Sequence, residues 1–170
     1  MNLTLLVGPS GSGKSTLLSS LRATGRASHF GRTYHVPNFD VQNTILIKSE
    51  PLVLRGTLLD NITCFGHFEK QKALACIQSL HLEHLAERYL SYRDGIISRG
   101  EAQRIVLARI ICSKVGAILM DESLNGLGDL LESECMEAIR KLASNKVFII
   151  VSHSRLDANL FDEVWMLNDS

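Results

Sequence analysis

Apolar runs recur along the chain and predict the strands of one sheet. They lie at Leu3–Val7, Thr44–Ile47, Ala117–Met120, Val147–Val151 and Val164–Leu167. Runs with little alternation of apolar and polar residues are typical of strands that are buried on both faces. The pattern therefore predicts a mostly parallel sheet.

Between these runs, apolar residues recur at helical spacing. One set is Leu131, Cys135, Ala138, Ile139 and Leu142, and another is Ala73, Leu74, Ile77 and Leu80. Residues 102–112 are apolar on most of their surface, which predicts a buried helix. The alternation of strands and helices predicts an α/β fold in which helices flank the parallel sheet.

Two segments interrupt this alternation. Residues 24–43, rich in Gly, Ser, His and Asn, are interpreted as an irregular connection. Residues 60–95 are rich in helical pattern and contain no obvious strand, so we expect a small helical subdomain inserted into the core. The predicted organisation is one domain over residues 1–170, with its core in residues 1–59 and 96–170.

The amino-acid composition indicates which classes of partner to expect. Of the 170 residues 45% are hydrophobic, and 18 basic side chains balance 18 acidic ones, so no general nucleic-acid surface is expected. The cysteines are dispersed without a C-x-x-C pair, which is typical of a reduced protein of the cytoplasm. No apolar stretch reaches the roughly 18 residues that a spanning helix needs, and the N-terminus is not typical of a signal peptide. A role at a membrane would therefore require a partner.

The strongest chemical signal follows the first apolar run. Residues 8–15 match the pattern G-x-x-x-x-G-K-S/T of a phosphate-binding loop between a strand and a helix. Glycines let the loop N–H groups point inward, with a helix N-terminus behind them, and Lys14 would contact the β- and γ-phosphates. The Ser15 hydroxyl would ligate Mg²⁺. The expected nucleotide contacts are Gly8, Pro9, Ser10, Gly11, Ser12, Gly13, Lys14, Ser15 and Thr16.

A second signal stands at the end of a later apolar run. Asp121 and Glu122 directly follow Ala117–Met120, which places both carboxylates at the carboxyl end of a strand, where ligands bind in such sheets. We expect Asp121 to hold Mg²⁺ through water, and Glu122 to orient or deprotonate an attacking water. The same two residues also suit an ordinary solvated strand end. The phosphate-binding loop favours the catalytic interpretation.

Two further segments carry a resemblance to a known family. Residues 98–104 read Ser-Arg-Gly-Glu-Ala-Gln-Arg, and Ser152-His153 directly follow the fourth apolar run. Together with the two motifs above, they resemble the signature and the switch histidine of the ATP-binding cassette (ABC) ATPases. Residues 50–62 are similar to the corresponding segment of exporter-type cassettes. The resemblance extends over residues 3–167.

This resemblance implies an ATPase that powers membrane export, with ATP and Mg²⁺ as cofactors. Cassettes of the family pair head to tail, so Ser98 and Gly100 of one chain would reach the γ-phosphate bound by Lys14 of the other. Glu122 and His153 would assist hydrolysis. The implied partners are a second cassette and transmembrane domains. The implied location is the cytoplasm, at the inner face of the membrane.

Four positions depart from the family pattern. Ser49 occupies the place of a metal-contacting glutamine, and Gly128 that of an aspartate which communicates across the dimer. In the signature, Arg99 replaces a glycine and Glu101 a glutamine. The departures at Ser49 and Gly128 support an alternative function, a degenerate cassette that binds ATP as a regulatory module without efficient turnover, whereas the intact Lys14, Glu122 and His153 oppose it.

Two questions remain open at the level of sequence. The family's adenine-stacking aromatic residue has no counterpart before the loop, so Tyr34, His35 or Phe39 would have to provide a stacking surface. A small-molecule or nucleotide kinase is a further alternative, because guanylate-kinase-like enzymes open with a similar loop. Such enzymes need an arginine-rich lid, whereas residues 60–95 supply only Arg88 and Arg93.

Overall fold

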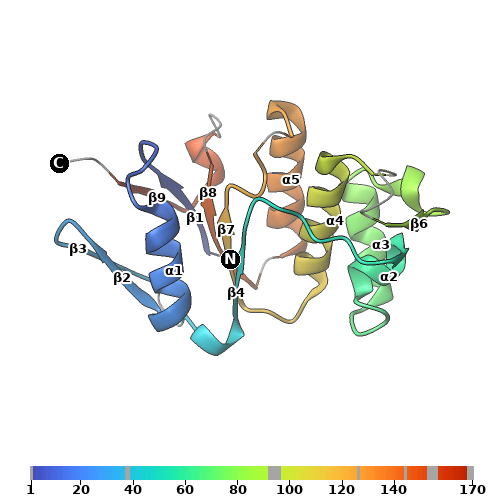
Figure 1. The fold of residues 1–170 in the computed structure, drawn as a ribbon, viewed down its shortest axis with the longest axis horizontal. Helices are drawn as coiled ribbons and strands as arrows, with labels where there is room; N and C mark the ends of the chain where they lie inside the picture. Colours follow the sequence, from blue (N-terminus) through green and yellow to red (C-terminus); the bar gives the residue numbers. More distant parts are fainter. Residues whose placement is uncertain are drawn as a thin grey trace. The chain divides into compact units, whose positions relative to one another are not determined.

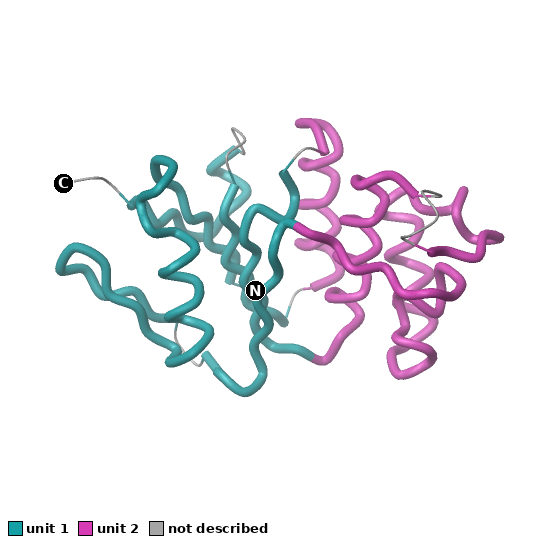
Figure 2. The backbone as a smooth tube through the Cα atoms, in the orientation of Figure 1, with its two compact units in different colours: residues 1–49, 115–125, 145–170 teal, residues 50–114, 126–144 magenta. Residues whose placement is uncertain are grey.

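The computed structural model describes residues 2–36, 39–91, 97–125, 127–143, 145–152 and 157–167. The chain forms two compact units, each built from separate stretches of sequence (Figure 2). Unit 1 comprises residues 1–49, 115–125 and 145–170, and unit 2 comprises residues 50–114 and 126–144. The subdomain predicted at residues 60–95 lies within unit 2. None of the described helices is both long and apolar enough to cross a membrane.

Unit 1 contains a parallel sheet of five strands in the order β4-β7-β8-β1-β9. The strands are β1 (Asn2–Val7), β4 (Thr44–Ile47), β7 (Ala117–Asp121), β8 (Val147–Val151) and β9 (Glu163–Met166) (Figure 1). The inner strands β1, β7 and β8 are buried along most of their length, which explains their continuous apolar sequence. The predicted α/β fold is confirmed, and the five predicted strands are found within one residue at each end.

Helix α1 (Lys14–Thr24) packs against this sheet. Leucines at helical spacing, Leu17, Leu18 and Leu21, turn one side of the helix toward the strands, and all three are at most 3% exposed. The cluster that they join also holds Leu6, Ala27, Tyr34, Val36, Leu119, Ile149, Val151, Trp165 and Leu167. The core of unit 1 therefore fixes the strand end from which the phosphate-binding loop departs.

Residues 24–43 form more regular structure than the sequence suggested. Strand β2 (Arg26–His29) pairs antiparallel with β3 (Arg32–His35), so the prediction of an irregular connection is wrong over these strands. The turn residues Phe30 and Gly31 have φ angles of 45° and 75°, as two-residue hairpin turns prefer because such angles match the strand twist. The hairpin buries Ala27 and Tyr34, one side chain from each strand, in the core. A short 3-10 helix, Val41–Asn43, leads on to β4.

Unit 2 is mainly helical. Its helices are α2 (Leu58–Thr63), α3 (Lys70–Ser79), α4 (Arg99–Cys112) and α5 (Asp129–Leu142), with a 3-10 turn at Glu83–Leu85. Helix α4 is buried along most of its length, as its apolar composition predicted. Two-residue strands, β5 (Gly56–Thr57) and β6 (Tyr89–Leu90), pair antiparallel. The sequence did not predict β6, because two residues carry no hydrophobic period.

Two arginines of α4 hold neighbouring segments of unit 2 in place. Arg104 is 8% exposed, and its Nη1 donates to the carbonyl oxygens of Leu80 at 2.8 Å and His81 at 3.1 Å, at the end of α3. Arg109 donates from Nε to the Asn61 carbonyl oxygen at 2.7 Å and from Nη2 to Asn61 Oδ1 at 3.1 Å. Burial lowers the pKa of Arg109. These bonds satisfy carbonyl groups that the short helices leave unpaired.

The cysteines are all free thiols. Cys76, Cys112 and Cys135 are buried and Cys64 is half-buried. Burial raises the pKa of Cys135 to about 12, so this thiol is protonated at neutral pH.

Candidate functional site

The phosphate-binding loop connects β1 to α1 and depends on its glycines. Gly11 and Gly13 have φ angles of 82° and 88°, a region that residues with a Cβ rarely occupy. Gly8 is required for space, since a Cβ there would lie 2.6 Å from the carbonyl oxygen of Leu167. The Ser12 N–H donates to the Pro9 carbonyl oxygen at 3.3 Å and closes the turn. The loop shape is therefore set by backbone geometry and by the end of β9.

The loop and the first turn of α1 line a pocket of about 320 Å³. Its lining residues are Ser10, Gly11, Gly13, Lys14, Ser15, Thr16 and Glu122. Helix α1 begins after Gly13 with no side-chain cap and no acidic residue in its first turn, so its first amides are not engaged by a capping side chain. Lys14 is 6% exposed, and its Nζ donates to the carbonyl oxygens of Gly8 at 2.8 Å and Pro9 at 2.6 Å. Amide donors and an ammonium group are the chemistry that binds phosphate.

An adjoining pocket of about 330 Å³ carries oxygen ligands. It is lined by Ser15, Ser19, Lys48, Ser49, Asp121 and Glu122. Among the described residues, Asp121 Oδ1 has no hydrogen-bond partner although it is buried. A buried carboxylate oxygen is costly unless a cation compensates its charge. The Ser15 hydroxyl and the Asp121 carboxylate are hard donors that fit Mg²⁺, which binds through one or two carboxylates and fills its shell with water and phosphate.

Glu122 is held in an unusual backbone conformation. Its φ angle is 55°, in the left-handed region that costs a non-glycine residue about 1–2 kcal/mol. The following turn holds it, since the Asn125 N–H donates to the Glu122 carbonyl oxygen at 3.2 Å and Asn125 Nδ2 donates to Glu122 Oε2 at 3.4 Å. Strain of this kind concentrates at functional positions. Glu122 lines both pockets, one beside the loop and one beside Asp121.

The signature-like segment lies in unit 2, at the start of α4. Ser98 is the N-cap, and its Oγ accepts a bond from the Glu101 N–H at 3.2 Å and donates to Glu101 Oε2 at 2.7 Å. The Ser98 N–H also donates to Glu101 Oε2, at 2.6 Å. This reciprocal arrangement is a capping box. Its S-x-x-E spacing is a sequence signal from which the cap could have been predicted. Gly100 packs close to Leu127, since a Cβ added at Gly100 would lie 3.2 Å from Leu127 Cδ2.

A histidine joins this cap. His84 Nε2 lies 2.5 Å from Glu101 Oε1. Desolvation raises the pKa of Glu101, but hydrogen bonds from His84 and Ser98 outweigh it and lower the pKa to about 2. The Glu101 carboxylate is therefore ionised at neutral pH. The sequence pattern did not reveal His84, because 17 residues separate it from Glu101 and only the fold brings them together.

The predicted site residues divide between the units. Unit 1 gathers the phosphate-binding loop, Ser49, Asp121 and Glu122, whereas Ser98 and Gly100 belong to unit 2. His153 lies outside the described residues, directly after Ser152, which is buried at the end of β8. Gly128 precedes α5 with a φ angle of 82°, so the aspartate found there in the family would be strained in this backbone.

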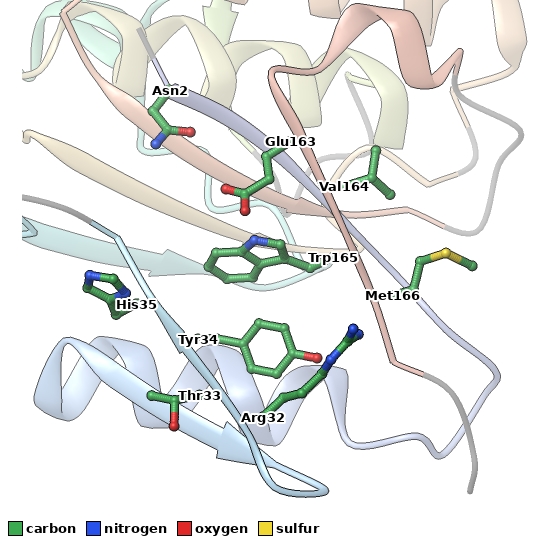
Figure 3. A pocket seen from close by; sticks show the side chains of 9 residues that line it. All are labelled: Asn2, Arg32, Thr33, Tyr34, His35, Glu163, Val164, Trp165 and Met166. Atoms are coloured by element: carbon green, nitrogen blue, oxygen red, sulfur yellow. The ribbon is translucent and has the colours of Figure 1, made fainter.

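A shallow groove of about 550 Å³ lies between β3 and β9 (Figure 3). Tyr34 and Trp165 form its floor, with ring centroids 5.1 Å apart. Tyr34 is only 8% exposed and belongs to the core, so it offers little surface to a nucleobase. His35 is exposed on the groove wall, and Phe39 packs against the core.

Comparison with known proteins identifies the family. The ABC transporter family model matches residues 2–125. The lactococcin-G-processing and transport ATP-binding protein of Lactococcus lactis subsp. lactis is 32% identical over 96% of this chain, which covers 25% of that protein. The aliphatic sulfonates import ATP-binding protein of Shouchella clausii is 30% identical over 96% of this chain and 65% of its own length. ABC transporter B family member 22 of Arabidopsis thaliana is 26% identical over 88% of this chain and 14% of its own length.

Solved structures agree on the fold. The chain superposes on a bacterial Atm1-family ABC exporter with ATP bound, with a TM-score of 0.73 at 22% identity, over 98% of this chain and 32% of that one. A putative ABC transporter ATP-binding protein from Pyrococcus furiosus gives a TM-score of 0.71 at 18% identity, over 98% of this chain and 84% of that one. The chain spans a quarter or less of the lactococcin-G and Arabidopsis proteins. The chain belongs to the ABC transporter family as its ATP-binding cassette, the ATPase domain typical of that family, and this family replaces the guanylate-kinase-like alternative.

Proposed function

We propose that this cassette binds Mg²⁺-ATP and hydrolyses it to power an export-type transporter. The observation that carries the proposal is that two motifs of unit 1 line one pocket. Ser15 lies there with Asp121 and Glu122, although more than a hundred residues separate Ser15 from the other two in sequence. The lactococcin-G-processing and transport protein supports a role in transport, and the resemblance of residues 50–62 to exporter-type cassettes favours the export direction.

The loop residues Gly8 to Thr16 hold the triphosphate. Gly13 supplies the open N-terminus of α1, and Lys14 supplies a buried ammonium. In the structure Lys14 Nζ donates to two loop carbonyl oxygens, so it is positioned over the loop. A phosphate oxygen would compete for these donors with a full negative charge, and bonds to charged acceptors are stronger than those to carbonyls.

Ser15 and Asp121 would hold Mg²⁺, which supplies charge stabilisation for the transferring phosphoryl group. Glu122 accepts a proton from, or orients, the attacking water, and it lines both pockets. His153 would assist from the end of β8. No covalent intermediate is required, because positioning and charge carry this reaction.

Two cassettes would pair head to tail to complete each site. Ser98 and Gly100 begin α4, and in a pair they would face the γ-phosphate held by the second chain. Transmembrane domains would transmit the closing and opening of the pair, which places the cassette at the cytoplasmic face of the membrane. ATP drives closure by its greater affinity for the closed state.

Glu122→Gln tests the enzymatic part of the proposal. We expect Mg²⁺-dependent ATP turnover to fall about 100-fold or more, because a general base contributes at least that much. ATP-dependent pairing, followed by light scattering, should persist. Glu137→Gln, an exposed change on α5, is the control and should leave turnover intact. Wild-type turnover no greater than that of Glu122→Gln would contradict hydrolysis by this chain.

A regulatory cassette is the second candidate, favoured by the ionised Glu101 at the start of α4. In that case the chain binds ATP and supports a complete partner cassette without turning over itself. Mixing it with a complete ABC cassette separates the two functions. If the chain is an ATPase, it hydrolyses ATP without the added cassette. If it is regulatory, it only raises the rate at which the added cassette hydrolyses ATP.

A further inference from the structure

The hairpin that follows α1 places a histidine against the phosphate-binding loop. His29, the last residue of β2, hydrogen-bonds through Nε2 to the carbonyl oxygen of Ser12. The same ring lies close to Gly13, since a Cβ added to Gly13 would lie 3.1 Å from His29 Nε2 and 3.6 Å from His29 Cδ2. A carbonyl oxygen only accepts, so His29 Nε2 carries the proton of this bond.

The hairpin turn also contacts the imidazole. The Phe30 ring packs on His29 with a centroid distance of 4.5 Å and an interplanar angle of 47°. Phe30 is nevertheless 68% exposed and has a left-handed φ angle of 45°. Although Phe30 is largely exposed, its ring contact limits the rotation of the His29 imidazole.

The bond to Ser12 acts on a single peptide plane. In a trans peptide the carbonyl of one residue and the N–H of the next point in opposite directions. Holding the Ser12 carbonyl toward His29 therefore directs the Gly13 N–H to the opposite side, and Gly13 lines the phosphate pocket. Without such a hold this plane would rotate easily, because Gly13 accepts negative and positive φ angles alike.

We propose that His29 is a positioning residue for the phosphate-binding loop, which fixes the Ser12–Gly13 peptide so that the Gly13 N–H faces a bound phosphate. The proposal rests on the proposed function for the identity of its ligand, whereas the bond between His29 and Ser12 is a feature of the fold. The bond also polarises the peptide, which strengthens the opposite N–H as a donor. Removing it should weaken ATP binding about 3- to 10-fold, the range of one net hydrogen bond.

Three variants test this role. His29→Ala removes the donor, His29→Gln keeps an N–H donor on a side chain of similar reach, and Thr33→Ala is the control on β3 of the same hairpin, where the side chain is exposed. ATP affinity is measured by calorimetry, and hydrogen exchange is measured on nucleotide-free protein for peptides covering residues 8–15 and residues 147–151. The second peptide reports the core strand β8.

We expect His29→Ala to weaken ATP binding and to speed exchange in residues 8–15 alone, His29→Gln to restore both at least in part, and Thr33→Ala to behave as wild type. Equal effects of His29→Ala and Thr33→Ala, or faster exchange in β8 as well, would overturn the positioning role. A Gln variant as impaired as the Ala variant would overturn the donor. Wild-type protein that binds no ATP would refute the proposed function instead, and the exchange comparison would then decide the role of His29.

Discussion

Two helices of this cassette begin in opposite ways. Helix α1 starts after Gly13 with no capping side chain and no acidic residue in its first turn. Helix α4 starts after Ser98 with a complete capping box, in which Glu101 binds both the Ser98 hydroxyl and the Ser98 N–H. Both helix ends carry the same partial positive charge. At the start of α1 this charge is left open to an anion from outside the chain, whereas at the start of α4 the Glu101 carboxylate provides the anion.

The difference shows that a helix N-terminus becomes an anion site only when the chain leaves it open. Glu101 replaces the neutral glutamine of the family signature, so its carboxylate adds a negative charge where the resemblance implies contact with a triphosphate. His84 offsets this charge only when it is protonated. The difference between the two helix ends therefore favours a cassette whose phosphate-binding loop binds a triphosphate more tightly than Ser98 and Gly100, which would contact the nucleotide of a second chain.

Lys14→Met should have the largest effect, because it removes the charge that makes the α1 end an anion site. We expect ATP affinity to fall about 10- to 100-fold, as for the loss of a hydrogen bond to a charged group. Calorimetric titration with ATP measures the effect. Lys70→Met, an exposed change at the start of α3, serves as the control. An ATP affinity of Lys14→Met equal to that of wild type would contradict the conclusion that the start of α1 is an anion site and the start of α4 is not.

Glu101→Gln should make the α4 end resemble the α1 end more closely. Glutamine can keep the capping geometry while removing the charge. In the Glu122→Gln background, where ATP-bound pairs accumulate, we expect half-maximal pairing at about two- to fivefold lower protein concentration, from the favourable dipole that becomes available. Sedimentation velocity with ATP measures it.

Glu134→Gln is the matched control for this gain. Glu134 pairs with His81 at 3.4 Å, a second histidine–carboxylate contact in unit 2 that does not involve the start of α4. Equal gains in the two variants would attribute the effect to overall charge and not to the helix end.

The fold was predictable wherever the local pattern is strong. Continuous apolar runs predicted the five strands, because strands buried on both faces have no polar alternation. The β2–β3 hairpin was missed because it buries only Ala27 and Tyr34, and because Phe30-Gly31 is not one of the asparagine- or aspartate-glycine pairs that mark such turns.

The candidate site follows the same division. The phosphate-binding loop and the Asp121-Glu122 pair are local motifs, and the structure places them around adjoining pockets. His29 against Ser12 and His84 against Glu101 are contacts 17 residues apart that depend on how a hairpin and a 3-10 turn fold back. A single sequence carries no periodic signal for such contacts. Their effects on charge and loop geometry therefore emerge only from the structure.

Acid titration should reveal the smallest effect, the stabilisation by the Glu101 cap. The pKa of Glu101 is lowered from its ordinary value of 4.5 to about 2, so the folded state favours the ionised carboxylate. Its contribution to stability is present above pH 4.5 and is lost as the pH falls toward 2. Because solvent screens part of this interaction, we expect the free energy of unfolding of wild type to drop by about 0.3–1 kcal/mol more than that of Glu101→Gln between pH 5 and pH 3. Urea unfolding followed by circular dichroism measures the difference, and parallel pH profiles of the two proteins would show that the carboxylate does not cap α4 more tightly than a neutral amide.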